Sequence, residues 1–267
     1  MKALSRAFMI FVFGVLYIPM IVLVLFSFNA SKSTGNFTGF SLRWYKELFS
    51  SPTTFIALRN TLILAVCSAA LATLIGTLAA VGVHKMKNKY VKGAVNSVTN
   101  IPMMNPEIVT GISMMLLFVF VGGLLGFEEK LSFWTMLIAH TTFNLPYVML
   151  SVAPKLRQMD VHLPEAAMDL GCTQMQAFLK VELPQILPGV ITGMMMAFTL
   201  SLDDFVISLF TSGSDFQTLP LLIYSMTKKE VTPDMYALST LMIAVIFLLM
   251  LVTNLRKSKD EKSVKVK

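Results

Sequence analysis

The chain has few of the residues on which soluble domains and secreted scaffolds depend. Only 14% of its 267 residues are charged and only two are cysteines, whereas about a quarter of a soluble domain is charged. Two cysteines do not make a disulfide framework, so we expect Cys67, in an apolar run, and Cys172, in a polar loop, to be free thiols. This composition excludes a disordered chain, a disulfide-rich secreted protein and a conventional cytosolic enzyme.

Motifs that carry enzyme chemistry are also missing. The sequence contains no glycine-rich phosphate loop, so any use of ATP and Mg falls to another chain. It contains neither an HExxH nor a GxSxG motif. His84, His140 and His162 are too scattered for a metal site. We therefore predict that the chain is not an enzyme, has no catalytic residues, and binds no metal or cofactor itself.

Long apolar runs dominate what is present. Hydrophobic residues make up 55% of the sequence, and a bilayer core of about 30 Å requires roughly 20 apolar residues of helix. We predict an all-α, polytopic membrane protein with one transmembrane domain, residues 1–267. Pro102 and Pro106 indicate a broken start to its third span. The six predicted spans are Ala7–Phe28, Leu62–Val83, Ile108–Phe127, Phe133–Ala153, Pro188–Phe210 and Tyr236–Leu255.

The distribution of Lys and Arg predicts the orientation of these spans. Positive charge gathers in the cytoplasmic loops of membrane proteins. Of the 22 Lys and Arg residues, 15 lie on the side that carries both termini and seven lie on the other side. We therefore place both termini in the cytoplasm, and we assign the net charge of +7 to membrane topology and not to nucleic acid.

A cytoplasmic loop, residues 154–187, follows the fourth predicted span. It is much longer than the roughly two to eight residues that usually connect helices in a bundle, and loops of this length commonly have a function. Asp160 is placed as the N-cap of a first short helix, which Gly171 ends. The pair Thr173-x-x-Gln176 makes a capping box for a second helix, which we expect Pro184 to end.

This pair of short helices has two physical interpretations. Met175, Phe178 and Leu179 form an apolar stripe, and the small Ala166 and Ala167 permit close approach by a neighbour. The stripe can seat in a groove of a soluble partner protein. Alternatively, the helix can rest on lipid headgroups with its apolar side toward the acyl chains.

The same loop contains the string Glu165-Ala166-Ala167-x3-Gly171-x9-Val181-x-Leu183-Pro184. It resembles the EAA loop of permease subunits in bacterial ABC importers, a family that usually has Ile in place of Val181. The resemblance implies a type I ABC importer permease fold, the MetI-like fold, in which this loop couples to a cytoplasmic ATPase subunit. It also implies that Glu165 contacts the ATPase and that Gly171 fixes the bend. The remaining coupling positions are Ala166, Ala167, Leu183 and Pro184.

The fifth predicted span contains two adjacent carboxylates, Asp203 and Asp204. Insertion scales give a cost of about 2.5–3.5 kcal/mol for each acid at the bilayer centre, so their presence requires an explanation. Three are open: one acid pairs with a base across helices, the two relay protons, or they line a path for a cation. Intramembrane Lys and Arg residues are scarce, which weakens the first. Ser201 lies on the same helical stripe as Asp204.

Three further residues each have two interpretations. Glu107 is either a path acid or a helix-start carboxylate that the helix dipole favours. Trp44 is either an aromatic contact for a cationic ligand or part of an interfacial aromatic belt. His140 either forms hydrogen bonds between helices or lines the path.

The order of these features resembles one branch of the importer family. Over roughly residues 15–250 the chain is similar to the C-type permease subunits of spermidine/putrescine importers. The segments that carry this resemblance, besides the EAA loop, are Tyr17-Ile-Pro19, Phe40-x3-Trp44-Tyr45, Pro106-Glu107-Ile108-Val109, Ser201-Leu202-Asp203-Asp204 and Leu219-Pro220-Leu221-x2-Tyr224-Ser225-Met226.

The resemblance implies a multi-pass protein of the bacterial cytoplasmic (inner) membrane that works by alternating access. Its implied partners are a B-type permease subunit, two cytoplasmic ATPase subunits that use ATP and Mg, an extracytoplasmic polyamine-binding protein and membrane lipid. The implied path residues are Trp44, Glu107, Ser201, Asp203 and Asp204. Two rival hypotheses are an ABC permease for another small substrate and an ATP-independent cation carrier or channel.

Overall fold

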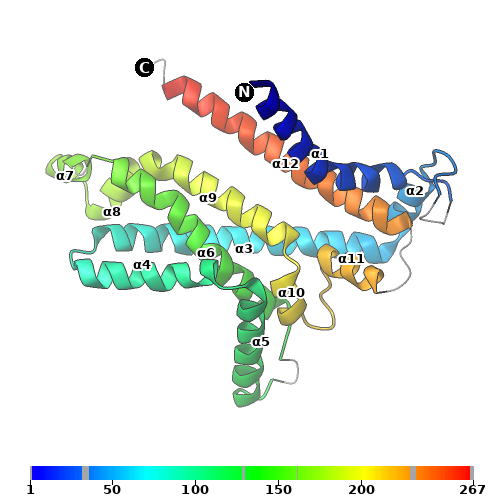
Figure 1. The fold of residues 1–267 in the computed structure, drawn as a ribbon. Coiled ribbons are helices and arrows are strands. Elements are labelled where there is room, and N and C mark those ends of the chain that lie inside the picture. Colours follow the sequence, from blue (N-terminus) through cyan, green and yellow to red (C-terminus); the bar gives the residue numbers. More distant parts are fainter. Residues whose placement is uncertain (1, 32–35, 128–129, 161, 229–232, 265–267) are drawn as a thin grey trace. The chain divides into compact units, whose positions relative to one another are not determined.

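The computed structural model describes residues 2–31, 36–127, 130–160, 162–228 and 233–264 (Figure 1). These residues are predominantly helical, and within them the one β-type pairing is an isolated bridge between Asn29 and Phe40. The all-α class is therefore confirmed for the described chain. Lys32, Lys229 and residues 265–267, which contribute to the predicted orientation, lie outside it.

The chain divides into two compact units. The first consists of Met1–Ala57 and Leu221–Lys267. It contains α1 (Lys2–Phe26), α2 (Arg43–Ser50), most of α11 (Leu219–Thr227) and α12 (Pro233–Val264). In this unit α12 packs against both α1 and α2.

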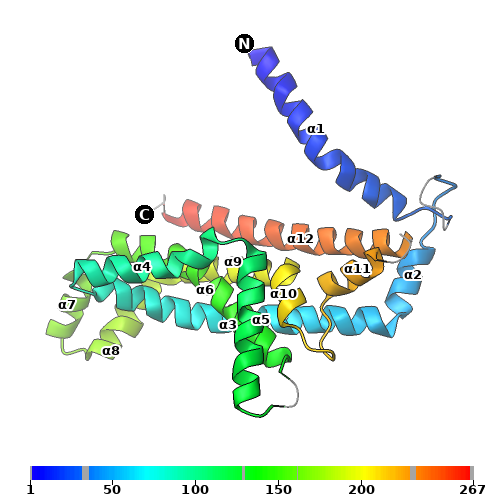
Figure 2. The same cartoon turned by 60° about the horizontal axis from the view of Figure 1, so that its bottom comes forward.

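The second unit, Leu58–Pro220, holds most of the predicted site. Here α6 packs along α9, while α5 stands across the direction of α3 and α4 in both views (Figure 2). Its core joins side chains of α3, α6 and α9, among them Ala72, Val148 and Ala197. The elements are α3 (Pro52–Lys85), α4 (Lys89–Met104), α5 (Glu107–Leu124), α6 (Phe133–Gln158), α7 (His162–Asp169), α8 (Gln174–Ala177), the π-helical η1 (Phe178–Glu182), α9 (Leu183–Asp203) and α10 (Val206–Thr211).

Five helices of the described chain are long and apolar enough to cross a membrane. They are Arg6–Phe26, Pro52–Lys85, Glu107–Leu124, Phe133–Gln158 and Gln174–Asp203. The sixth predicted span coincides with a shorter apolar helix, Pro233–Leu248. The number of spans, the orientation and the single domain over 1–267 with its loop at 154–187 stay predictions.

The predicted broken start of the third span is confirmed. A separate helix, α4, ends at Met104, and α5 begins at Glu107. Between them Asn105 (ψ 144°) and Pro106 (ψ 133°) have extended backbone. Proline disfavours the helical conformation of the residue before it, which explains the break after Met104. Pro102, by contrast, stays inside α4.

Three helices approach one another closely because glycines face a neighbouring helix. A Cβ atom at Gly189 would lie 2.8 Å from the carbonyl oxygen of Ser151, and one at Gly193 would lie 3.1 Å from the Cα atom of Val148. On α3, a Cβ atom at Gly76 would lie 2.9 Å from the side chain of Val148. Small residues with this spacing permit close contact between membrane helices. The packing of α3, α6 and α9 therefore depends on these positions.

We expect Gly189→Ala to lower the stability of the purified protein, because the new methyl group meets rigid backbone. Overpacking of this kind costs about 1–3 kcal/mol. Gly82→Ala on α3 is the matched control, since no atom lies within 4 Å of its added Cβ. Thermal unfolding in detergent measures both variants. Equal unfolding temperatures for the two would contradict the close packing of α6 and α9.

Candidate functional site

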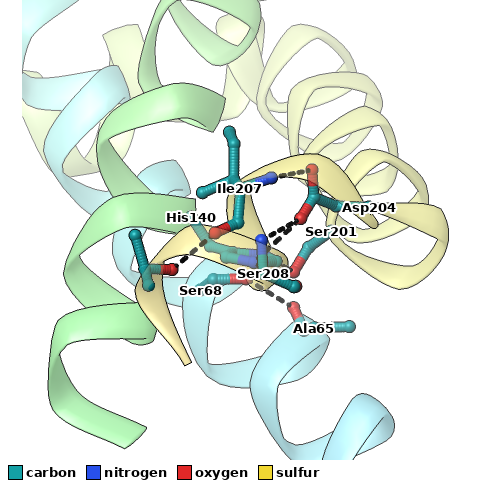
Figure 3. A network of polar contacts seen from close by, with 8 residues as sticks. Ala65, Ser68, His140, Ser201, Asp204, Ile207 and Ser208 are labelled. Carbon is teal, nitrogen blue, oxygen red and sulfur yellow. Dashed lines mark hydrogen bonds and ion pairs between the residues drawn. The ribbon is translucent and has the colours of Figure 1, made fainter. Parts of the chain in front are cut away.

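The polar residues predicted in the fifth span gather at a break between α9 and α10. Asp203 is the last residue of α9, and Asp204 has extended backbone with φ −63° and ψ 125°. The Asp204 carboxylate accepts the backbone N–H of Ser208 at 2.8 Å and that of Ile207 at 3.3 Å (Figure 3). It therefore satisfies two of the donors that the first turn of α10 leaves free. The predicted continuous span Pro188–Phe210 is wrong in this respect.

His140 of α6 lies against the same carboxylate (Figure 3). Its Nε2 atom is 3.3 Å from Asp204 Oδ2 and 3.0 Å from Ser208 Oγ. Its Nδ1 atom is 2.8 Å from Ser201 Oγ, which accepts a hydrogen bond from Ser68 Oγ on α3 at 2.9 Å. The side chains of His140 and Asp204 are only 2% and 5% exposed. A buried polar network thus joins α3, α6, α9 and α10.

This geometry bears on the three interpretations of the acid pair. Asp204 has a histidine partner from another helix, which corresponds to pairing across helices. An imidazole that carries hydrogen on Nε2 donates to the carboxylate whether the ring is neutral or charged. His140 has the first of its two expected roles, since it forms hydrogen bonds between helices. The place of Asp204 and Ser201 in a substrate path stays a prediction.

Asp203 and Glu107 lie outside this network, and both are exposed. Glu107, the first residue of α5, is within electrostatic range of Asp203. The start of α5 is held against α10 at Gly111, where a Cβ atom would lie 2.8 Å from Phe210 Cδ2. Two of the predicted path acids are thus exposed, and Glu107 acts electrostatically on Asp203.

Sequence reasoning missed Tyr147, on which Glu107 acts electrostatically. Tyr147 is half-buried on α6 and is within electrostatic range of Glu107. It follows His140 by seven residues, about two helical turns, so the two lie on the same side of α6. That spacing was the available signal. A phenol here can donate a hydrogen bond to a carboxylate or accept one from an ammonium group.

Trp44, the predicted path aromatic, belongs to the other unit and is packed inside it. Its side chain is 4% exposed, and its Nε1 atom donates to the carbonyl oxygen of Asn29 at 2.6 Å. The guanidinium carbon of Arg43 lies 5.4 Å from the ring centroid. The indole N–H is therefore occupied and a resident cation lies over the ring. Contact of Trp44 with a cationic ligand stays a prediction.

The two short helices predicted for the loop after α6 are present as α7 and α8. Gly171 between them has φ +89°, a conformation that favours glycine. Thr173 Oγ1 accepts the N–H of Gln176 at 3.3 Å, and Gln176 Oε1 accepts the N–H of Thr173 at 3.0 Å. The capping box is therefore confirmed. Asp160 Oδ1 likewise accepts the N–H of His162 at 3.0 Å, as expected of a cap.

The coupling positions on α7 differ in exposure. The Glu165 side chain is 70% exposed, with the Nδ1 atom of His162 3.4 Å from its Oε2 atom. Ala166 is exposed, whereas Ala167 is buried. One face of α7 therefore packs inward and the other carries a carboxylate on the surface.

The predicted apolar stripe of the second helix is only partly right. Met175 and Leu179 are exposed, as expected, and Leu170 in the preceding turn is exposed too. Phe178 instead packs against the buried core of the second unit, with Lys85 Nζ 6.0 Å from its ring centroid. The exposed apolar residues of the loop thus include Leu170, Met175 and Leu179, besides Leu163 and Met168 on α7.

Pro184 does not end the second helix as predicted. From Gln174 to Asp203 the chain is continuously helical, because η1 joins α8 to α9 with the N–H of Leu183 bonded to the carbonyl of Phe178 five residues earlier. Pro184 then falls in the first turn of α9, where its missing N–H is tolerated. Leu183 packs against the core, and Pro184 is exposed.

An ion pair between a buried carboxylate and an exposed lysine, also missed from the sequence, ties this segment to α3. Lys85 Nζ lies 2.7 Å from Glu182 Oε1, and the Glu182 side chain is only 3% exposed. No local pattern signals the pair, because its two members are 97 positions apart in sequence. The end of α3 is therefore linked to the π-helical segment that leads into α9.

Relatives of the chain are membrane components of binding-protein-dependent transporters. A family model described as binding-protein-dependent transport system inner membrane component matches residues 72–256. The chain is 40% identical to the spermidine/putrescine transport system permease protein PotC of Haemophilus influenzae over 257 residues, which cover 96% of this chain and 97% of that protein. It is 38% identical to the putrescine transport system permease protein PotI of Escherichia coli K12 over 234 residues, 88% of this chain and 83% of that protein.

Solved structures with a similar fold are ABC transporters. The bacterial transporter that imports the acidic polysaccharide alginate gives a TM-score of 0.79 at 16% identity, covering 97% of this chain and 94% of that chain. The methionine transporter MetNI, in an inward-facing conformation, gives a TM-score of 0.61 at 19% identity, covering 77% of this chain and 96% of that chain. These similarities confirm the predicted permease fold.

The Lys85–Glu182 pair yields a stability prediction. Lys85→Met leaves the Glu182 carboxylate buried without its charge partner, and we expect a loss of about 1–3 kcal/mol. Combining it with Glu182→Gln, which removes the unpaired charge, should recover part of that loss. Thermal unfolding of the purified protein measures the effect, with Lys87→Met, at an exposed lysine two residues on, as control. Equal losses at Lys85 and Lys87 would show that the pair has no role in stability.

Proposed function

The chain belongs to the family of binding-protein-dependent transport system inner membrane components, and from that premise we propose that it is a permease subunit of an ATP-driven importer of polyamines. It is a multi-pass protein of the bacterial inner membrane. Similarity over nearly the whole chain to PotC, named for spermidine and putrescine, and to PotI, named for putrescine, supports the substrate class.

The proposal includes the finer topology and the partners. Six spans with both termini in the cytoplasm suit the distribution of positive charge. The partners are a second, B-type permease subunit, two cytoplasmic ATPase subunits that use ATP and Mg, and an extracytoplasmic polyamine-binding protein. The family description itself names dependence on a binding protein, and the alginate transporter has been solved in complex with its periplasmic protein.

The observation that carries the substrate proposal is the exposed pair of acids, Asp203 and Glu107. Exposed carboxylates repel an anion, and two of them attract a ligand with more than one positive charge. At a separation of about 4 Å and an effective dielectric constant near 20, each ammonium–carboxylate contact contributes about 4 kcal/mol before desolvation. Several contacts of this size hold a flexible polycation and still permit its release.

The continuous helix from Gln174 to Asp203 supports a mechanism of alternating access. At 1.5 Å per residue it is about 45 Å long. It begins in the loop whose exposed Glu165, Leu170 and Met175 suit docking on an ATPase, and it ends at a path acid. Movement of the loop when the ATPase closes is thereby carried along one rigid element to the acids. An ATP-independent carrier or channel would leave this exposed loop without a role.

We expect Asp203→Asn and Glu107→Gln each to lower ATP-dependent polyamine uptake at least about tenfold. Each substitution removes an ammonium–carboxylate contact of about 4 kcal/mol before desolvation, and a tenfold change corresponds to only about 1.4 kcal/mol. Uptake of labelled spermidine and putrescine by the complete importer, reconstituted in proteoliposomes, measures this. Asp215→Asn is the control, since Asp215 is also exposed and lies in the loop after α10. Full uptake by both path variants would overturn the substrate assignment.

Glu165 tests the docking half of the proposal. We expect Glu165→Lys to weaken association with the ATPase subunits and to lower uptake of spermidine and putrescine in proportion, since the residue is remote in sequence from the path acids. Co-purification of the ATPase with the permease measures association. Asp169→Lys, which changes another exposed acid of α7, is the matched control. A changed preference between the two polyamines would show that Glu165 affects substrate selection, and would contradict its assignment to ATPase docking.

A further inference from the structure

We propose that His140 is a positioning residue for transport: it holds the Asp204 carboxylate at the break between α9 and α10 and thereby sets the direction in which Asp203 meets the cargo. This inference rests on the proposed function and divides the adjacent acids into two roles. Asp203 contacts the cation, and Asp204 maintains the backbone that presents Asp203.

The contacts of Asp204 leave it little capacity for a cargo. Its oxygens accept from Ser208 N at 2.8 Å and Ile207 N at 3.3 Å, and His140 Nε2 lies 3.3 Å from Oδ2. An ionised carboxylate offers about four acceptor sites, and this one is 5% exposed. A cation would have to displace His140 or unwind the first turn of α10 to reach it. The Asp204 carboxylate therefore stabilises the backbone at the start of α10 and does not contact the cargo.

His140 is itself held from both sides of its ring (Figure 3). Ser201 contacts Nδ1 and is fixed by Ser68, while Ser208 and Asp204 contact Nε2. Rotation of the ring would break contacts on both sides at once, in a region where water is excluded and an unpaired polar group is costly. The imidazole is thus a rigid support that reaches from α6 to the break.

Asp203 is coupled to this support through the backbone. Asp203 is the last helical residue of α9 and is exposed, whereas Asp204 has extended backbone and a side chain that is 5% exposed, so the two side chains do not share one direction. When Asp204 is fixed in extended conformation, ψ 125°, the last turn of α9 and the Asp203 side chain are fixed with it. Loss of the His140 contact frees the break to change angle, and Asp203 moves relative to Glu107.

Two substitutions separate the contacts of the ring. His140→Gln can place an amide N–H near the position of Nε2 and keep a donor for Asp204. His140→Asn is shorter, reaches only the position of Nδ1, and keeps the Ser201 contact alone. The matched pair therefore differs in the contact that the proposal requires, while both remove the imidazole.

The readout is the ratio of putrescine to spermidine uptake by the complete importer in proteoliposomes, with ATP hydrolysis measured in parallel. We expect His140→Asn to lower putrescine uptake at least about threefold more than spermidine uptake, because a dication loses one of its two charge contacts. His140→Gln should keep the wild-type ratio. In an Asp203→Asn background, His140→Asn should cause no further change of the ratio, since it acts through Asp203.

A merely structural role predicts a different pattern. Uptake of both polyamines would then fall in proportion to the amount of assembled protein, and the ratio of putrescine to spermidine uptake would stay unchanged. That result overturns the proposal. The proposal is also overturned if His140→Asn changes the ratio equally in the Asp203→Asn background. If His140→Asn does not assemble, Asp204→Asn, which removes the charge that His140 Nε2 faces, decides by the same ratio, and an unchanged ratio refutes the proposal. Wild-type protein that imports neither polyamine would instead refute the proposed function on which this inference rests.

Discussion

A buried carboxylate is tolerated only if donors replace the water it has lost, and the break between α9 and α10 meets that condition for Asp204. The donors come from the backbone of α10 and from His140. To supply backbone N–H groups the helix has to stop and start again. The break, the short α10 and the exposed position of Asp203 at the end of α9 follow from that requirement.

The opposite end of the helix Gln174–Asp203 has to remain rigidly connected to the docking loop. A π-helical segment joins α8 to α9 just before Pro184, so the helix continues without a break, and the Lys85–Glu182 pair ties this segment to α3. Glycines at 76, 189 and 193 bring α3, α6 and α9 close enough to move together. In the proposed importer, a displacement at the docking loop and a rearrangement at the acids are then two ends of one rigid body.

Features with a local cause could be predicted from the sequence. The Thr173–Gln176 capping box, the left-handed Gly171 and the break before Glu107 each depend on residues within a few positions. Features with a distant cause could not. His140, the partner of Asp204, lies 61 positions before Ser201 and further still from Asp204. No spacing rule in the sequence therefore shows that Asp204 has a partner. The hydrogen bond from the Trp44 indole to the carbonyl oxygen of Asn29, 15 positions earlier, and the burial of the ring likewise have no local signal.

The central claim, that Asp203 and Glu107 contact the cargo while Asp204 stays with His140, is tested most directly by an experimental structure of the complete importer with spermidine trapped in the path. The account predicts ligand amines against Asp203 and Glu107, with His140 Nε2 still beside the Asp204 carboxylate. A spermidine amine on Asp204, with the imidazole turned away, would contradict it.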